Sequence, residues 1–148
     1  QGSGAWLGWK AIVAALLASD DLGPSTTLTE RICDYLGARP RGIADAMANQ
    51  PPKEFAKLAS IVFAEAKSGD AVALSIIEEG VSYLNNMARK ILTENPGRLA
   101  LLGGLRSEIT PWLADDVKAA LSDPIHAPED GAIHFAKSES ANANKKAG

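Results

Sequence analysis

Residues 1–20 read QGSGAWLGWKAIVAALLASD, a glycine-rich start followed by the longest apolar run of the chain. Ser3 can cap a helix that begins near Ala5, because its hydroxyl can accept hydrogen bonds from backbone N–H groups of the first helical turn. The sequence predicts this helix as far as about Ser19. Since the helix is apolar on nearly every side, we expect it to be buried.

The opening Gly2-Ser3-Gly4 allows two interpretations from local sequence alone. A short glycine–serine stretch at an amino terminus is typical of a linker remnant. The same residues could instead be the second half of a ligand-binding loop whose first half is absent. The local pattern leaves both interpretations open.

The composition is that of a globular domain without a strong charge. Of the 148 residues, 46% are hydrophobic and 22% are charged, and the net charge is −3. A mildly acidic chain gives no reason to expect a nucleic acid or an anionic membrane as partner. The longest apolar run, 11–18, is too short to cross a bilayer, which takes about 20 residues. With Cys33 as the single cysteine, the sequence excludes a disulfide framework, and we expect a cytoplasmic location.

Helical patterns continue through the first two thirds of the chain. Thr27-Leu28-Thr29-Glu30 has the spacing of a capping box and predicts the start of a helix. Apolar residues from Phe55 to Ala66 recur with the helical period and predict one continuous helix. Asp70 can cap a longer helix that reaches about Leu92. Helices should therefore dominate this part of the fold.

The pattern then changes to alternating short elements. The run RLALLGGL, residues 98–105, predicts a buried strand closed by a glycine turn, and a helix is expected over about 109–121. PIHAP, 124–128, predicts a second short strand, and EDGAIHFAKSE, 129–139, a last helix. The polar residues 138–148 are expected to form a flexible tail. Because two short strands make a poor sheet, we expect a helix-rich part of an α/β domain whose sheet lies mostly elsewhere.

Two glycine turns are candidate ligand sites. Gly103-Gly104 follows a predicted strand and precedes a helix, the place where open α/β sheets bind ligands. Glycine there lets backbone approach a flat base or a phosphate, although an ordinary turn explains the pair equally well. Asp130-Gly131 is either a turn that opens the last helix or another such approach.

The sequence shows no other chemistry. It contains neither of the common glycine-rich phosphate-binding motifs. His126 and His134 have no cysteine or regularly spaced carboxylate near them, so we expect no metal site. Cys33 has no histidine nearby in sequence and is interpreted as a buried thiol. We find no nucleophile–base pair and therefore expect no catalytic residue in this chain.

Four segments together resemble a known family. GSGAWLGWKAI, FAEAKSGDAVA, LALLGGL and PEDGAIHFA look like the C-terminal part of the BadF/BcrA-type ATPases, and within them the N-acetylglucosamine/glucosamine kinases. The resemblance covers Gln1 to about Lys137, nearly the whole chain. It implies the C-terminal ribonuclease-H-like lobe of the actin/hexokinase/Hsp70-like fold over residues 1–137, in incomplete form.

The resemblance also implies roles for individual residues. Gly2 and Ser3 would belong to a sugar-binding loop, which favours that interpretation of the opening stretch over a linker. The family's sugar-binding aspartate precedes this loop and is absent here. The residues implied at the adenosine pocket are Gly103, Gly104, Ala66 and Gly131.

The implied activity is ATP-dependent phosphorylation of N-acetylglucosamine or glucosamine, with ATP and Mg²⁺ as cofactors. The catalytic base and the phosphate-binding loop would lie in a missing N-terminal lobe of the same protein, so the chain alone is expected to be inactive. Related kinases also lead us to consider a homodimer. The alternative from another functional class is a non-catalytic helical module that binds a protein partner.

Overall fold

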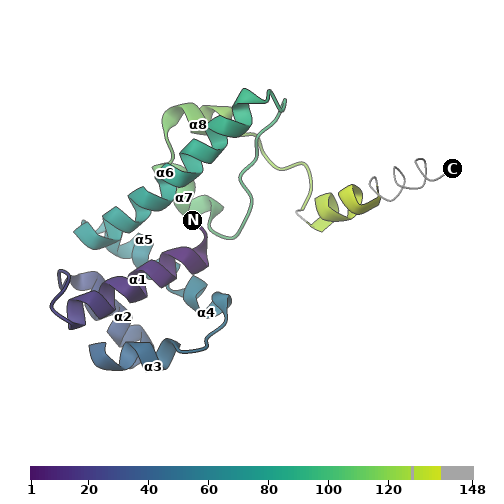
Figure 1. The fold of residues 1–148 in the computed structure, drawn as a ribbon. Coiled ribbons are helices and arrows are strands. Elements are labelled where there is room, and N and C mark those ends of the chain that lie inside the picture. The colour runs from purple at the N-terminus through teal and green to yellow at the C-terminus, as the bar shows by residue number, and fades with distance from the viewer. Residues whose placement is uncertain (128, 138–148) are drawn as a thin grey trace.

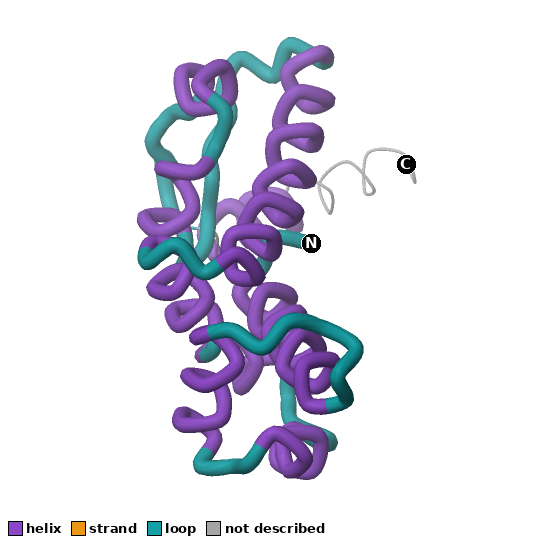
Figure 2. The backbone as a smooth tube through the Cα atoms, turned by 90° about the vertical axis from the view of Figure 1, so that its left-hand side faces the viewer, coloured by secondary structure: helices purple, strands orange, loops and turns teal. Residues whose placement is uncertain are grey.

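The computed structural model describes residues 1–127 and 129–137 and is dominated by helices (Figures 1 and 2). A further helix, 129–137, follows the elements labelled in Figure 1. The helices, including two short 3₁₀ turns (η), are α1 Gly4–Ser19, α2 Thr27–Leu36, η1 Pro40–Gly42, α3 Ile43–Met47, α4 Pro52–Lys57, α5 Ala59–Lys67, α6 Ala71–Thr93, α7 Arg106–Ile109, η2 Thr110–Trp112 and α8 Asp115–Ala120.

Helix α1 lies at the centre of the helical body and contacts α2, α4, α5 and α6. Its start agrees with the sequence prediction, because the Ser3 hydroxyl accepts a hydrogen bond from the Trp6 N–H at 3.3 Å. Leu7 and Ala11 of α1 are fully buried in the core. The expectation of burial on all sides is wrong for Trp9, which is 50% exposed. Burial therefore follows one broad face of the helix.

The predicted helix from Phe55 to Ala66 is interrupted at Leu58, where α4 ends and α5 begins. The Phe55 carbonyl accepts from the Leu58 N–H at 3.0 Å, the three-residue spacing of a tighter turn. The interruption lies where α1 crosses α4. A Cβ atom built on Gly8 would lie 1.8 Å from the Phe55 carbonyl oxygen, so the two backbones meet without an intervening side chain.

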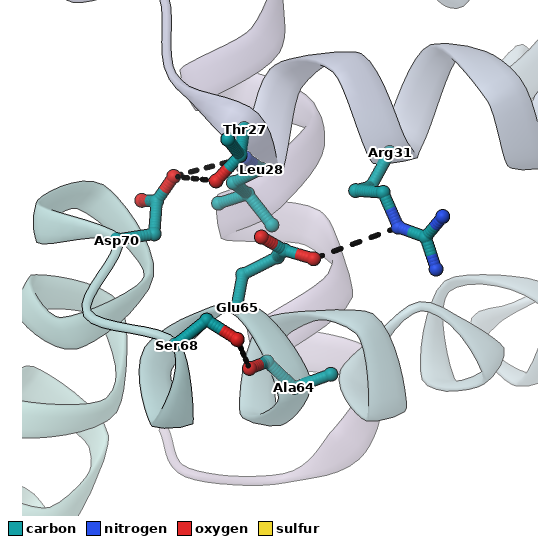
Figure 3. Close-up of polar contacts among 7 residues, drawn as sticks. All are labelled: Thr27, Leu28, Arg31, Ala64, Glu65, Ser68 and Asp70. Atoms are coloured by element: carbon teal, nitrogen blue, oxygen red, sulfur yellow. Dashed lines mark hydrogen bonds and ion pairs between the residues drawn. The ribbon is translucent and has the colours of Figure 1, made fainter.

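The N-terminus of α2 is capped by a residue distant in sequence, which corrects the predicted capping box at 27–30. The Asp70 carboxylate accepts hydrogen bonds from the Leu28 N–H at 2.9 Å and the Thr27 hydroxyl at 3.0 Å (Figure 3). Its other oxygen accepts from the N–H groups of Val72 and Ala73, both at 2.9 Å, at the start of α6. One carboxylate thus caps two helices, and the prediction that Asp70 caps a long helix is confirmed.

After α6 the chain turns back along the helix and departs from the prediction (Figure 1). The segments 98–105 and 124–127, expected as strands, form no regular strand among the described residues. One isolated parallel bridge joins Leu99 to Leu121. The helix expected over 109–121 is divided into α7, η2 and α8, with Pro111 in η2. Short extended segments without neighbouring strands cannot form a ladder.

The last described helix, 129–137, agrees with the predicted final helix, and all its residues are exposed. Residue 128, the end of the predicted second strand, and residues 138–148, the predicted flexible tail, lie outside the described residues. In the described part of the chain, no helix combines the length and the apolar content needed to cross a membrane.

Candidate functional site

The two glycine loops singled out from the sequence line one groove. Gly2 and Ser3 lie on one side of it and Gly103 and Gly104 on the other, although about a hundred residues separate them in sequence. The groove has a volume of about 350 Å³ and is open to solvent. Leu84 of α6 forms part of its wall. The structure therefore brings together the residues that the resemblance assigns to the sugar loop and to the adenosine pocket.

The sugar-side loop is held in place by close packing between glycines. Gly2 is buried and has a φ of +76°, a conformation that glycine adopts readily and other residues rarely do. A Cβ atom on Gly80 of α6 would lie 3.3 Å from the Gly2 Cα, and one on Gly2 would lie 3.0 Å from the Leu84 side chain. Two glycines thus allow the start of α1 to lie directly against α6.

Ser3 is the polar group that this loop presents. The residue is exposed, and its hydroxyl oxygen caps α1. A hydroxyl that accepts one hydrogen bond still has its own hydrogen to donate. Ser3 can therefore cap the helix and hydrogen-bond to a ligand hydroxyl in the groove at the same time.

The opposite loop presents bare backbone. Gly103 has a φ of +117°, and its carbonyl accepts from the Arg106 N–H at 3.1 Å, which begins the turn into α7. A Cβ atom added to Gly103 or Gly104 would meet no protein atom within 4 Å. These glycines are therefore not required by packing of the chain against itself, and their backbone faces open space that a flat ligand can approach.

The rest of the lining is aliphatic with one cation. Leu102, Leu105 and Ile109 contribute apolar surface, and Arg106 is the one ionisable side chain among the described lining residues. The Arg106 guanidinium donates to the Asp123 carboxylate at 2.6 Å. Sequence reasoning missed Arg106. A basic residue two positions after a glycine turn was the available signal, but only the fold shows that it lines the groove.

The other two candidate residues lie elsewhere. Gly131, on helix 129–137, lines a second hollow with Ala100 and Leu102, on the segment that leads into Gly103. Ala66 is 3% exposed and belongs to the core on the inner face of α5, so the structure does not bring it to the groove.

Nucleophilic and metal chemistry are not prominent in the described residues. Burial, and next the nearby Asp34, raise the pKa of the Cys33 thiol, which disfavours the reactive thiolate. No group of three or more histidine, cysteine or acidic residues in the described ranges is placed to hold a metal ion. The groove can bind and orient a ligand, but its described lining offers no general base.

The comparisons with known proteins agree with this site. The chain is 24% identical over 145 residues to the glucosamine kinase GspK of Vibrio cholerae, covering 98% of this chain and 49% of that protein. It superposes on a crystal structure from Chromobacterium violaceum assigned as an N-acetylglucosamine kinase, with a TM-score of 0.80 and 26% identity over 89% of this chain. The resemblance to amino-sugar kinases is confirmed. No family model matches the chain.

The chain spans about half the length of these two relatives, 49% of one and 46% of the other. The similarity therefore supports both the helix-rich fold class and the expectation that the chain corresponds to part of a larger kinase fold. Because a half-length match includes only part of a kinase, the activity of the whole protein is a matter for proposal.

Proposed function

We propose that residues 1–137 are the C-terminal lobe of an ATP-dependent amino-sugar kinase that phosphorylates glucosamine or N-acetylglucosamine. One observation carries the proposal. A chain that matches a glucosamine kinase over 98% of its length places Gly2 and Ser3 opposite Gly103 and Gly104 in one groove. The lobe would supply the adenosine wall and one edge of the sugar site.

The residues of the groove fit a nucleotide. The open backbone at Gly103 and Gly104 leaves space for the face of a purine, and Leu102 and Leu105 give it apolar neighbours. Arg106 supplies a positive charge that can pair with a phosphate oxygen. ATP would supply the phosphoryl group that is transferred.

The sugar edge is formed by the loop before α1. The Ser3 hydroxyl would donate to a sugar hydroxyl, and the buried Gly2 would fix the loop against α6. A site that hydrogen-bonds a sugar rejects ligands that leave its polar groups unpaired. This loop therefore contributes to selection as well as to binding.

The remaining parts of the reaction fall outside these residues. Phosphoryl transfer needs a base that orients the attacking hydroxyl, and Mg²⁺ that bridges phosphate oxygens. The described residues hold no cluster of metal ligands, so Mg²⁺ would be held by the phosphates and by the N-terminal lobe. We expect the 148-residue chain alone to bind weakly and not to turn over.

The experiment is an ADP-release assay on the complete product of the reading frame that contains residues 1–148. Glucosamine and N-acetylglucosamine are compared with glucose, and the 148-residue chain is the control. We expect sugar-dependent ADP release from the complete product only, with at least one amino sugar preferred over glucose. ADP release that is independent of any amino sugar would contradict the proposal.

The same reasoning bears on location and assembly. We propose a cytoplasmic protein, since the chain has one cysteine and its proposed cosubstrate ATP is a cytoplasmic metabolite. The homodimer stays a prediction, tested by light scattering of the complete product. The similarity to two sugar kinases favours catalysis over the alternative of a helical interaction module.

A further inference from the structure

Residues 98–102 form an extended segment that is paired along one edge. Leu99 forms a parallel bridge with Leu121, and the Ser122 N–H donates to the Leu99 carbonyl at 2.7 Å. The Arg98 guanidinium donates to the Asp123 carbonyl at 3.0 Å. These contacts fix one edge of the segment against residues 121–123.

The opposite edge has no backbone partner among the described residues. In an extended chain, the N–H and C=O groups of successive residues point to alternate edges. Since Leu99 points toward Leu121, Ala100 and Leu102 point away from it. Backbone hydrogen bonds between described residues include none to the N–H or C=O of Ala100 or Leu102. We call this side of residues 98–102 the open edge.

Both faces of the segment are apolar, as in a strand from the interior of a sheet. Leu99 and Leu101 line a narrow apolar hollow of about 100 Å³ against Met87 of α6. Ala100 and Leu102 line the hollow on the other side, beside Gly131. A strand with two apolar faces is typical of a sheet that is covered on both sides. Met87 is nevertheless 45% exposed and Leu102 50% exposed, so apolar surface next to the open edge lacks a cover in this part of the protein.

We propose that the open edge of residues 98–102 binds a β-strand from the part of the protein that lies outside residues 1–148. The inference rests on the proposed function only in taking this chain as part of a longer kinase. The relatives supply the argument for this occupant, because the chain covers 49% and 46% of their lengths and leaves about an equal length of polypeptide to supply it. A two-segment pair is marginal on its own, and further strands would stabilise it.

Amide hydrogen exchange tests the pairing directly. We would compare the 148-residue chain with the complete product of its reading frame at Ala100 and Leu102. Both amides should exchange rapidly in the 148-residue chain and at least about tenfold more slowly in the complete product, because a strand would then accept from them. Protection that rises with the concentration of the 148-residue chain would assign the edge to a second copy and overturn the proposal.

A matched pair of substitutions at one position separates edge pairing from other effects. Ala100→Pro removes the N–H of the open edge, whereas Ala100→Val keeps it and favours extended backbone. Ala100→Pro should lower the melting temperature of the complete product by about 3 °C or more and leave that of the 148-residue chain nearly unchanged. Ala100→Val should leave both nearly unchanged.

Three results would overturn the proposal. Equal destabilisation of both proteins by Ala100→Pro would show that proline strains the segment itself. Unprotected Ala100 and Leu102 amides in the complete product would show that the edge stays open. A reading frame with no further half would remove the proposed occupant. Since the readouts are exchange and stability, a loss of kinase activity would test the proposed function separately.

Discussion

The carboxylate of Asp70 accepts a hydrogen bond from the Leu28 N–H at 2.9 Å, across 42 residues of sequence. Because the same carboxylate caps α6, the start of α2 is fixed to the turn between α5 and α6. Nearby, the Arg31 guanidinium lies 3.5 Å from the Glu65 carboxylate and joins α2 to α5 (Figure 3). The position of α2 in the body therefore depends on one acidic side chain.

Asp70→Asn should lower the free energy of unfolding by about 1–3 kcal/mol, because an amide replaces one of the two accepting oxygens with a donor. Urea unfolding followed by circular dichroism measures the change. Asp20→Asn is the control, since Asp20 is exposed at the end of α1 and should be nearly neutral. Equal stability of the Asp70 variant and the wild type would contradict the double cap.

The Asp70 cap also predicts a pH dependence. Burial by itself would raise the pKa of this carboxyl, but hydrogen bonds from the Ala73 and Leu28 N–H groups and from the Thr27 hydroxyl outweigh it and lower the pKa. With a folded-state pKa below the unfolded value, the stabilisation is present above about pH 4 and is lost as the pH falls through the folded pKa. The stability difference between wild type and Asp70→Asn should shrink over that acid range. A constant difference would count against an ionised cap.

Gly8→Ala should destabilise the protein by about 3 kcal/mol or more, because its Cβ would lie 1.8 Å from the Phe55 carbonyl oxygen. Alanine normally favours a helix interior over glycine, so a loss would be due to the crossing of α1 and α4. The matched control is Gly104→Ala, where no atom lies within 4 Å of the new Cβ and the change should stay within about 0.5 kcal/mol. A stabilised Gly8→Ala would contradict the close crossing.

Arg106→Gln should raise the KM for ATP of the complete product about tenfold and leave the KM for the sugar nearly unchanged, because a charge-assisted contact to phosphate is lost. Steady-state kinetics measure both constants. Asp123→Asn is the control, since it removes the 2.6 Å partner of Arg106 and keeps the cation. If both variants raised the KM for ATP equally, the ion pair and not the charge in the groove would be responsible.

Local signals in the sequence predicted much of the helical framework. Ser3 and Asp70 were found as caps from residue type alone, because a cap is a property of a few neighbouring residues. The interruption at Leu58 was not predictable from periodicity, since it coincides with the crossing at Gly8. The cap of α2 was assigned to its own threonine because the distant carboxylate of Asp70 has no local signature.

The candidate site shows the same division. Gly103 and Gly104 were found as a turn that could bind a ligand, but the resemblance, and not the local pattern, connected them with Gly2 and Ser3. Only the fold places the two loops across one groove and adds Arg106 to it. The expected strands failed to form because pairing depends on segments that the described residues do not supply.

The most direct test of the groove as a combined nucleotide and sugar site is a pair of KM measurements on the complete product. Gly104→Val adds a side chain where the structure has open space, and Ser3→Gly removes a hydroxyl while keeping an acceptable N-cap. We predict that Gly104→Val raises the KM for ATP about tenfold or more with little effect on the sugar, and that Ser3→Gly does the reverse. If neither variant changed either KM, or if each changed both equally, the groove would not be the site we have assigned.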